Sequence, residues 1–348
     1  MARSRKISPF TCLLLVMVLL LSIGLLGVLL ADSRYQASSA ADDSGDTAAD
    51  TTEKTVSAVS EAGPEAADTE MPEWLQPAEP EPVQEKSPPE GALTAPDILS
   101  NAQVIAHGLG AIDGTTTLNC LEGFQQQYAQ GVRVFEVDLR LTADQQVVLR
   151  HDWRAGWQEG VSETAIPTLE EFLDKPLLEK YTPLSFQDLL LLMEEYPDIC
   201  IVTDTKFTDA EIVTLQFEAM LSDAKELGLS YLFDRMVIQV YSQLMYTVTD
   251  SLHHFPYYFY TLYTEGFGRT EEAFRELAAF CSENGIMGIT MWDYWWDEDY
   301  VPIAQEYGVQ VFTHTVNDSQ EALTLLSSGI SAVYTDTLVP GDLTGQGE

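Results

Sequence analysis

Two acidic residues, Glu136 and Asp138, stand two positions apart in an apolar run that is typical of a β-strand. Side chains two apart in a strand point to the same face, so both carboxylates point the same way. Such a pair on an inward face repels itself unless it is protonated, paired with a cation or bridged by a metal ion. Hard divalent cations, Ca²⁺ or Mg²⁺, prefer such oxygen ligands. The pair indicates a metal site, with a buried salt bridge to Arg140 or Arg150 as the alternative.

Asp204 and Lys206 repeat this spacing at the end of another apolar run. Asp204 is predicted to complete a three-carboxylate metal site. Lys206 is predicted to neutralise one oxygen of a phosphate group. The alternative is a plain ion pair between Lys206 and Asp204, which the spacing alone favours nearly as well.

Three of the five histidines, His107, His151 and His314, follow runs that are typical of strands. Active sites of barrel folds form at the carboxyl ends of strands, so these residues are candidates for an active site. A hydrogen-bonded core histidine is the alternative for any single one. Three histidines at strand ends, together with the acids, favour a catalytic site.

The elements that must position these residues alternate between short apolar runs and stretches of helical spacing. The expected strands are Gln103–His107, Val132–Leu141, Val147–His151, Ile199–Thr205, Met236–Tyr241, Tyr257–Leu262, Gly288–Trp292, Val309–Thr315 and Ala332–Asp336. The expected helices are Leu118–Gln130, Ser185–Glu195, Asp209–Leu227, Gln243–Leu252, Glu271–Asn284, Glu298–Tyr307 and Ser319–Ser328. Residues 153–183 break the alternation, and we interpret them as an insertion on the carboxyl-terminal rim.

The alternation indicates βαβ units and a parallel sheet, which belong to the α/β class. About eight such units in roughly 250 residues fit a (β/α)₈ TIM barrel, whose active site forms at the carboxyl ends of the strands. An open doubly wound sheet is the alternative, but the chain has no Gly-rich dinucleotide fingerprint. The barrel is expected to bring the histidines and acids together at one end.

Residues 1–31 have the pattern of a signal anchor. Three basic residues, Arg3, Arg5 and Lys6, precede the uncharged apolar stretch Phe10–Ala31, which is long enough to cross a bilayer. The basic flank keeps the amino terminus cytoplasmic, so we predict a single-pass protein of the cell membrane with an extracytoplasmic catalytic domain. A cleaved signal peptide is the alternative.

Residues 32–95 form an acidic segment rich in Ala, Ser, Thr and Pro, with 15 acidic residues against three basic ones. Such a segment buries too little apolar surface to fold, so we predict a disordered linker. The remaining domain, residues 96–348, carries 40 acidic and 11 basic residues. This charge argues against a nucleic-acid partner, and it requires a local cation wherever the domain binds a phosphate.

Several motifs of this domain occur together in a characteristic order and spacing. They are Ile105–Gly108, Leu118–Phe124, Phe135–Asp138, Leu141–Asp144 and Val148–Asp152, followed by Thr182–Leu184, Asp204 with Lys206, Thr315–Asp318 and Tyr334–Asp336. Over residues 102–340 the chain resembles the glycerophosphodiester phosphodiesterase family of the phospholipase C-like phosphodiesterase superfamily. The resemblance implies a TIM barrel and a phosphoric diester hydrolase.

Carried over residue by residue, the resemblance implies that His107 and His151 are the catalytic acid–base pair. It implies that Glu136, Asp138 and Asp204 bind a divalent metal ion, Ca²⁺ or Mg²⁺. His314 stands where the family often has Trp. The expected substrate contacts come from Lys206, Asn119, His314 and Trp292.

The chain departs from the family pattern at three places. Gly108 stands where Arg is usual, and residues 117–120 read Thr-Leu-Asn-Cys where Pro-Glu-Asn-Thr is usual. Asp204 replaces the usual Glu, which shortens this ligand by one methylene. We interpret the chain as an active branch that hydrolyses a glycerophosphodiester, or a lipid or cell-surface polymer that contains glycerol phosphate. Phospholipase action on intact lipid headgroups and a non-catalytic surface-binding module are the alternatives.

The signal-anchor hypothesis predicts that the native protein stays with the membrane fraction after a carbonate wash, because an apolar span remains in the bilayer. Immunoblotting of the washed membranes and the supernatant measures this distribution. A soluble mature form that begins near residue 32 would instead demonstrate cleavage.

Overall fold

The computed structural model describes residues 83–154, 156–263 and 269–344. The chain divides into two units, Met1–Pro77 and Ala78–Glu348, and all described residues belong to the second. The predicted membrane helix and most of the predicted linker lie outside the described residues. Among the helices that are described, none combines the length and the apolar character needed to cross a membrane.

Eight parallel strands close into a barrel within the described residues. They are β1 (Val104–Ala106), β2 (Val134–Leu141), β4 (Cys200–Asp204), β5 (Met236–Val240), β6 (Tyr258–Thr261), β7 (Gly288–Trp292), β8 (Gln310–His314) and β9 (Ala332–Thr335). Each pairs with the next in this order, and β9 pairs with β1 to close the ring. The predicted (β/α)₈ TIM barrel is confirmed.

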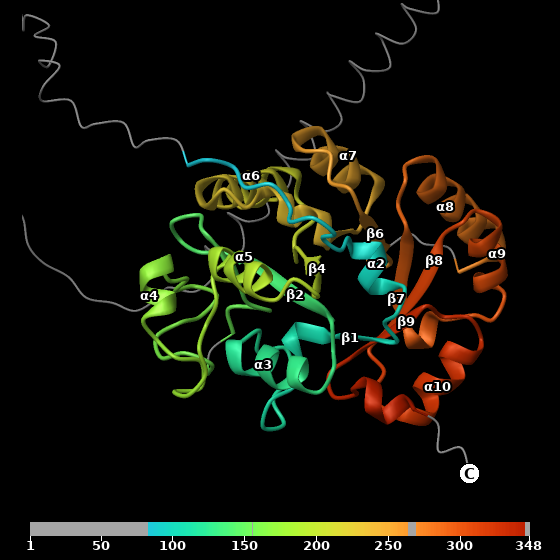
Figure 1. The fold of residues 1–348 in the computed structure, drawn as a ribbon, viewed down its shortest axis with the longest axis horizontal. Coiled ribbons are helices and arrows are strands. Elements are labelled where there is room, and N and C mark those ends of the chain that lie inside the picture. Colours follow the sequence, from blue (N-terminus) through green and yellow to red (C-terminus); the bar gives the residue numbers. More distant parts are fainter. Residues whose placement is uncertain (1–82, 155, 264–268, 345–348) are drawn as a thin grey trace, which may run out of the picture. The chain divides into compact units, whose positions relative to one another are not determined.

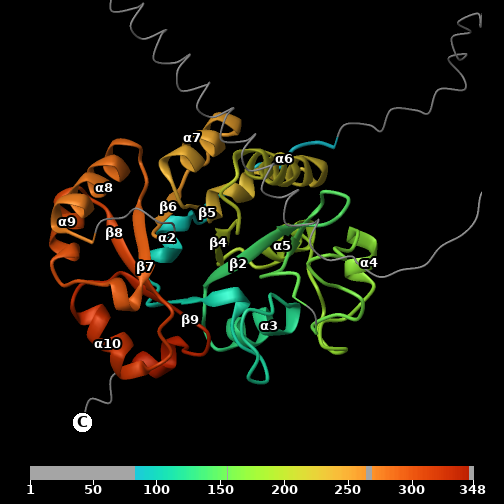
Figure 2. The same cartoon turned by 180° about the vertical axis from the view of Figure 1, so that it is seen from behind.

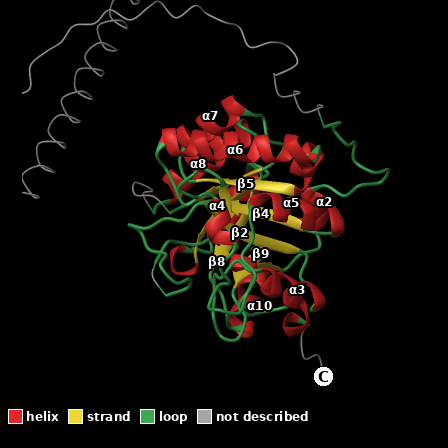
Figure 3. Cartoon of the chain, turned by 90° about the vertical axis from the view of Figure 1, so that its left-hand side faces the viewer, coloured by secondary structure: helices red, strands yellow, loops and turns green. Residues whose placement is uncertain are grey.

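Helices surround the strands on the outside of the barrel (Figures 1 and 2). They are α3 (Leu121–Ala129), α5 (Phe186–Glu195), α6 (Ala210–Leu227), α7 (Gln243–Leu252), α8 (Glu271–Glu283), α9 (Tyr300–Glu306) and α10 (Ser319–Ser327). In α8 the buried residues are Phe274, Leu277, Ala278 and Cys281, which is the spacing of one helical face. Figure 3 shows the resulting layers, with the strands inside and the helices around them.

The alternation of side chains in β2 decides which groups enter the barrel. Phe135, Val137 and Leu139 point outward into the main hydrophobic core between strands and helices. Glu136 and Asp138 have the opposite orientation and therefore point into the barrel. The predicted orientation of this strand is confirmed.

One short helix, α2 (Ala95–Leu99), was not predicted and closes the amino-terminal end of the barrel. Its Ile98 packs in one cluster with inward residues of the strands, among them Ile105 and Val202. Thr94 begins the helix in a capping box, in which its backbone N–H donates to Asp97 Oδ2 at 2.9 Å. Because α2 fills this end, a site inside the barrel belongs at the other one.

Residues 83–94 fall within the predicted linker, yet the structure places them against the domain. The backbone N–H of Lys86 donates to Gly228 O at 2.9 Å. The hydroxyl of Ser230 donates to Glu85 Oε1 at 2.8 Å. This end of the linker is therefore anchored to the barrel, and disorder stays a prediction for the preceding residues.

The segment after His151 does interrupt the alternation, as predicted. It contains α4 (Leu169–Leu173) and a separate small core that includes Trp153 and Phe172. Arg150, which is fully buried, donates its Nε–H to Asp152 O at 2.6 Å, and its guanidinium lies 4.6 Å from the centre of the Trp157 ring. The segment begins directly after β3 (Val147–Leu149), which pairs antiparallel with β2.

Candidate active site

Three carboxylates meet inside the carboxyl-terminal end of the barrel. Glu136 and Asp138 come from β2, and Asp204 is the last residue of β4, where it pairs in register with Asp138. The three residues are 2%, 0% and 1% exposed. One oxygen from each lies within 4.8 Å of the others. The predicted acidic cluster is therefore assembled.

The electrostatics of this cluster fit a bound cation. Burial raises the pKa of Glu136, and the charge of Asp138 raises it further. Burial also raises the pKa of Asp204. Glu136 Oε1 and Asp204 Oδ1 have no hydrogen-bond partner among the described residues. A hard divalent cation such as Ca²⁺ or Mg²⁺ would offset the repulsion and satisfy these oxygens, so the donor set fits such an ion.

Lys206 is the cationic side chain beside the cluster. Its Nζ lies 2.6 Å from Asp138 Oδ1 and also forms an ion pair with Asp204. Burial opposes its charge, but Asp204 and Asp138 raise the pKa of Lys206 above its usual value. The ion pair given as an alternative role for Lys206 is present. Arg140 and Arg150, the other candidate partners, donate to main-chain carbonyl groups instead.

Asn119 holds Asp138 from the loop before α3. Its Nδ2 donates to Asp138 Oδ2 at 2.6 Å, and its Oδ1 accepts from the backbone N–H of Asp138 at 3.0 Å. Asn119 is fully buried and has a φ of 53°, so it cannot belong to a helix. The helix predicted from Leu118 therefore begins only at Leu121.

His107 follows β1 and is held by a carboxylate from the other end of the chain. Its Nδ1 lies 2.8 Å from Oδ1 of Asp336, which follows β9. Asn317 Nδ2 donates to the second oxygen of Asp336 at 2.7 Å. Burial would lower the pKa of His107, but Asp336 and the charges of Glu136 and Asp138 raise it to about 9. The carboxylates around it therefore favour the protonated imidazole.

His151 lies beyond the antiparallel strand β3 and not at the end of a barrel strand. Its Nδ1 is 2.7 Å from Asp152 Oδ2, and Arg154 Nε donates to the same oxygen at 2.7 Å. The backbone N–H of Arg150 donates to Asp138 O at 2.8 Å. This bond ties the segment that carries His151 to the strand that carries the carboxylates.

His107, His151, Asp204 and Lys206 meet in one pocket of about 390 Å³. Its lining residues are His107, His151, Asp204, Lys206, Thr208, Tyr241, Tyr263, Trp292, His314 and Thr315. The ring centre of His314 lies 4.4 Å from that of Trp292 and 5.0 Å from that of Tyr263. Burial, then the charges of His107 and Lys206, lower the pKa of His314 to about 3. One wall is therefore charged, and the other is aromatic and neutral.

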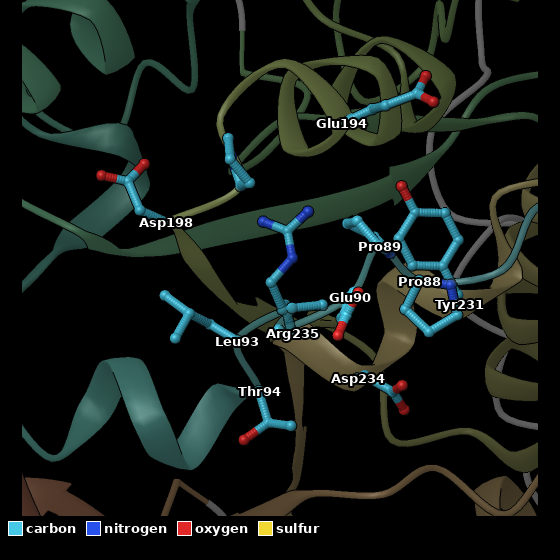
Figure 4. Close-up of a pocket in the computed structure, with 13 residues that line it drawn as sticks. Pro88, Pro89, Glu90, Leu93, Thr94, Glu194, Asp198, Tyr231, Asp234 and Arg235 are labelled. Atoms are coloured by element: carbon cyan, nitrogen blue, oxygen red, sulfur yellow. The ribbon is translucent and has the colours of Figure 1, made fainter.

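A second pocket, of about 560 Å³, lies toward the amino-terminal ends of the strands (Figure 4). It is lined by residues 88–94 together with Asp198, Tyr231 and Arg235, among others. Arg235 Nη1 donates to the carbonyl groups of Tyr196 and Ile199 at 3.0 and 3.1 Å, so its guanidinium is used to hold the chain. This pocket is larger, but the predicted catalytic residues His107 and His151 line the other one.

A sequence model of the glycerophosphoryl diester phosphodiesterase family matches residues 112–339, more than half of the chain. The chain belongs to this family. The matched residues include Glu136, Asp138, His151 and Asp204, and His107 lies just before them. The predicted family is confirmed, and with it a phosphodiesterase enzyme. The family generally uses divalent metal ions, which agrees with the acidic cluster.

Solved structures of glycerophosphoryl diester phosphodiesterases share the fold. A putative enzyme from Silicibacter pomeroyi is 20% identical, with a TM-score of 0.58 over 70% of this chain and 92% of that one. A phosphodiesterase from Oleispira antarctica, in complex with the product sn-glycerol-3-phosphate, is 18% identical, with a TM-score of 0.55 over 67% and 92%. An enzyme from Parabacteroides distasonis is 18% identical, with a TM-score of 0.54 over 68% and 93%. No protein in the curated set matches the sequence.

Two of the departures noted for this family member pack against each other. Gly108 has a φ of 54°, and a Cβ at this position would lie 2.5 Å from Thr117 Cα. An arginine therefore does not fit at residue 108 while the loop around Thr117 keeps its course. The backbone N–H of Gly108 donates to Glu136 Oε2 at 2.6 Å, so this close approach also serves the acidic cluster.

The partners of the histidines were missed by the sequence analysis. Asp152 and Asp336 were noted as motif residues but were given no role. The position of Asp152 directly after His151 was one available signal. Asp336 could be found only by recognising that the last strand of a closed barrel lies beside the first.

The Asp336→Asn variant is predicted to lower the pKa of His107 from about 9 toward its usual value of 6.5. Burial lowers this pKa, and Asp336 is one of the carboxylates that raise it. An NMR titration of the imidazole in the metal-free protein measures this change. Asp113→Asn, which changes an exposed aspartate paired with Lys180, is the control and should leave the pKa of His107 as it is. An unchanged pKa in Asp336→Asn would contradict the assigned pairing.

Proposed function

We propose that this protein hydrolyses a glycerophosphodiester, or a lipid or polymer that contains glycerol phosphate, by acid–base catalysis with His107 and His151. The observation that carries the proposal is the single pocket in which both histidines meet Asp204 and Lys206. The family gives the phosphodiesterase chemistry. The glycerol phosphate bound to the Oleispira antarctica relative supports a substrate of this type.

The phosphate group is assigned to the charged wall of the pocket. A divalent cation held by Glu136, Asp138 and Asp204 would polarise a phosphate oxygen and stabilise the charge that develops during the reaction. Lys206 stands beside these carboxylates and lines the pocket, so its ammonium group is available to a second phosphate oxygen. In a domain this acidic, the substrate needs such local positive charge.

His107 is assigned as the general acid and His151 as the general base. Asp336 lies 2.8 Å from Nδ1 of His107 and favours the protonated imidazole, which can supply a proton to the leaving alkoxide. Asp152 orients His151 through Nδ1, which leaves Nε2 to accept a proton from the nucleophile. Water and a neighbouring hydroxyl of the substrate are the two candidate nucleophiles, and ³¹P NMR of the products separates phosphomonoester from cyclic phosphate.

The alcohol part of the substrate is assigned to the aromatic wall. His314 Nε2 is buried and has no hydrogen-bond partner among the described residues, so it can bond to a hydroxyl group. Trp292 offers a ring beside it on which an apolar or sugar-like face can lie. Asn119 receives a different role from the predicted substrate contact, because it is buried against Asp138.

Hydrolysis of intact phospholipid is the second candidate. Tyr294, on the short helix η4 (Asp293–Trp295), is 68% exposed and stacks on Trp292 with a ring separation of 5.8 Å. An exposed aromatic residue at the mouth of the pocket suits a lipid interface. The predicted single-pass anchor in the cell membrane, with the domain extracytoplasmic, would hold it near such a substrate.

The full-length protein is predicted to release product from glycerophosphocholine, from intact phospholipid or from a glycerol-phosphate polymer. Its activity should be lost in EDTA and restored by Ca²⁺ or Mg²⁺. His107→Ala and His151→Ala should each reduce turnover by about 100-fold or more, because general acid–base catalysis contributes this much. His254→Ala, an exposed histidine, is the control and should keep full activity.

Two results would contradict the proposal in different ways. Turnover that persists without any metal would remove the cation from the mechanism. If the wild-type protein turns over none of the three substrates, and the histidine variants behave in the same way, the non-catalytic binding module is favoured.

A further inference from the structure

The inside of the barrel contains a hydrogen-bonded belt of polar side chains. Its members are Gln239 of β5, Thr261 of β6, Thr290 of β7 and Tyr334 of β9, all of them buried. Thr290 Oγ1 donates to Thr261 Oγ1 at 2.8 Å, and Thr261 Oγ1 donates to Gln239 Oε1 at 3.0 Å. Tyr334 Oη donates to the same Gln239 oxygen at 3.0 Å. Side chains of four strands are therefore joined in one network, and two of them bond directly to the Gln239 amide.

The belt engages one end of the Gln239 amide. Oε1 accepts from the hydroxyl groups of Thr261 and Tyr334 at 3.0 Å each. Nε2 accordingly points away from Thr261 and Tyr334. It has no hydrogen-bond partner among the described residues, although Gln239 is only 1% exposed.

Gln239 is the neighbour of a metal-ligand candidate. Thr203 of β4 pairs with Ile238 of β5, so the following residues, Asp204 and Gln239, lie side by side on the inward face. Asp204 Oδ1 also lacks a partner among the described residues. A buried donor and a buried acceptor on adjacent strands, each without a direct partner, are the surroundings in which proteins hold an internal water.

We propose that Gln239 is a positioning residue of the metal site, with its Nε2 donating through one bound water to one lone pair of Asp204 Oδ1, whose other lone pair is left for the cation. The proposal rests on the metal site of the proposed function. It adds to that site a residue that does not itself bind the cation. The amide thereby orients the Asp204 carboxylate for binding the cation. The hydroxyl groups of Thr261 and Tyr334 hold the amide in turn.

Calorimetric titration of the metal-free, full-length protein with Ca²⁺ and with Mg²⁺ tests this role. Gln239→Met keeps the side-chain length and removes both polar atoms, and it is expected to weaken cation binding by about 10- to 100-fold, as the loss of an outer-shell partner does. Tyr334→Phe removes one of the two hydroxyl groups that fix the amide and should weaken binding in the same direction. It provides a second test if Gln239→Met does not fold.

Gln216→Met is the matched control. Gln216 is a fully buried glutamine of α6 whose amide atoms also lack partners among the described residues, and it lies outside the barrel interior. Its substitution should leave the affinity for the cation unchanged. Wild-type affinity in both Gln239→Met and Tyr334→Phe, or an equal loss in Gln216→Met, would overturn the role of Gln239. If the wild-type protein binds neither cation, the metal site of the proposed function fails, and this inference fails with it.

Discussion

Mutual repulsion between three buried carboxylates is the constraint around which this site is arranged. Glu136, Asp138 and Asp204 are each at most 2% exposed, and removing a charged group from water costs several kcal/mol. The neighbouring groups reduce this cost from several sides. Lys206 pairs with Asp138 and Asp204, Asn119 donates to Asp138, and the backbone of Gly108 donates to Glu136. A divalent cation would complete this compensation, and its charge would serve a phosphate substrate in an otherwise acidic domain.

The closed barrel is what brings the candidate catalytic groups to this cluster. The pairing of β9 with β1 places Asp336 beside His107, although 228 residues lie between them in the chain. The short strand β3 folds back on β2 and places His151 next to the same carboxylates. Each histidine is therefore oriented by its own aspartate, and the two approach the pocket from different elements. The aromatic wall of Trp292 and His314 occupies the remaining side.

Much of this arrangement was predictable from the sequence because it depends on local spacing. The alternation of apolar residues located the strands, and the two-residue spacing of Glu136 and Asp138 placed both inside the barrel. Contacts between segments that are distant in the chain were not predictable in this way. Asp336 pairs with His107, and Asn119 with Asp138, because the folded barrel brings them together. The local spacing of residues carries no sign of either contact. The same holds for residues 83–94, whose composition suggested a linker and whose contacts with the domain come from individual hydrogen bonds.

The belt of Gln239, Thr261, Thr290 and Tyr334 illustrates a related limit. In the sequence, each of these residues is an ordinary member of a predicted strand. Only the closed barrel joins their side chains into one network. Lys206 is the opposite case, because its spacing from Asp204 indicated two roles and the structure contains the ion pair. Its position at the edge of the pocket leaves the phosphate role consistent with that pair. Polar groups inside the barrel are thus used to orient charge, and apolar groups fill the opposite end.

The central claim, that the carboxylate triad binds a divalent cation, is tested most directly by diffraction from crystals soaked in Mn²⁺, with data collected at a wavelength where manganese scatters anomalously. The predicted result is one strong anomalous peak ligated by Glu136, Asp138 and Asp204, at roughly the 2.0–2.6 Å typical of hard cations and carboxylate oxygens. A map with no peak at these three residues, and with the Lys206 ammonium still paired to both aspartates, would contradict it.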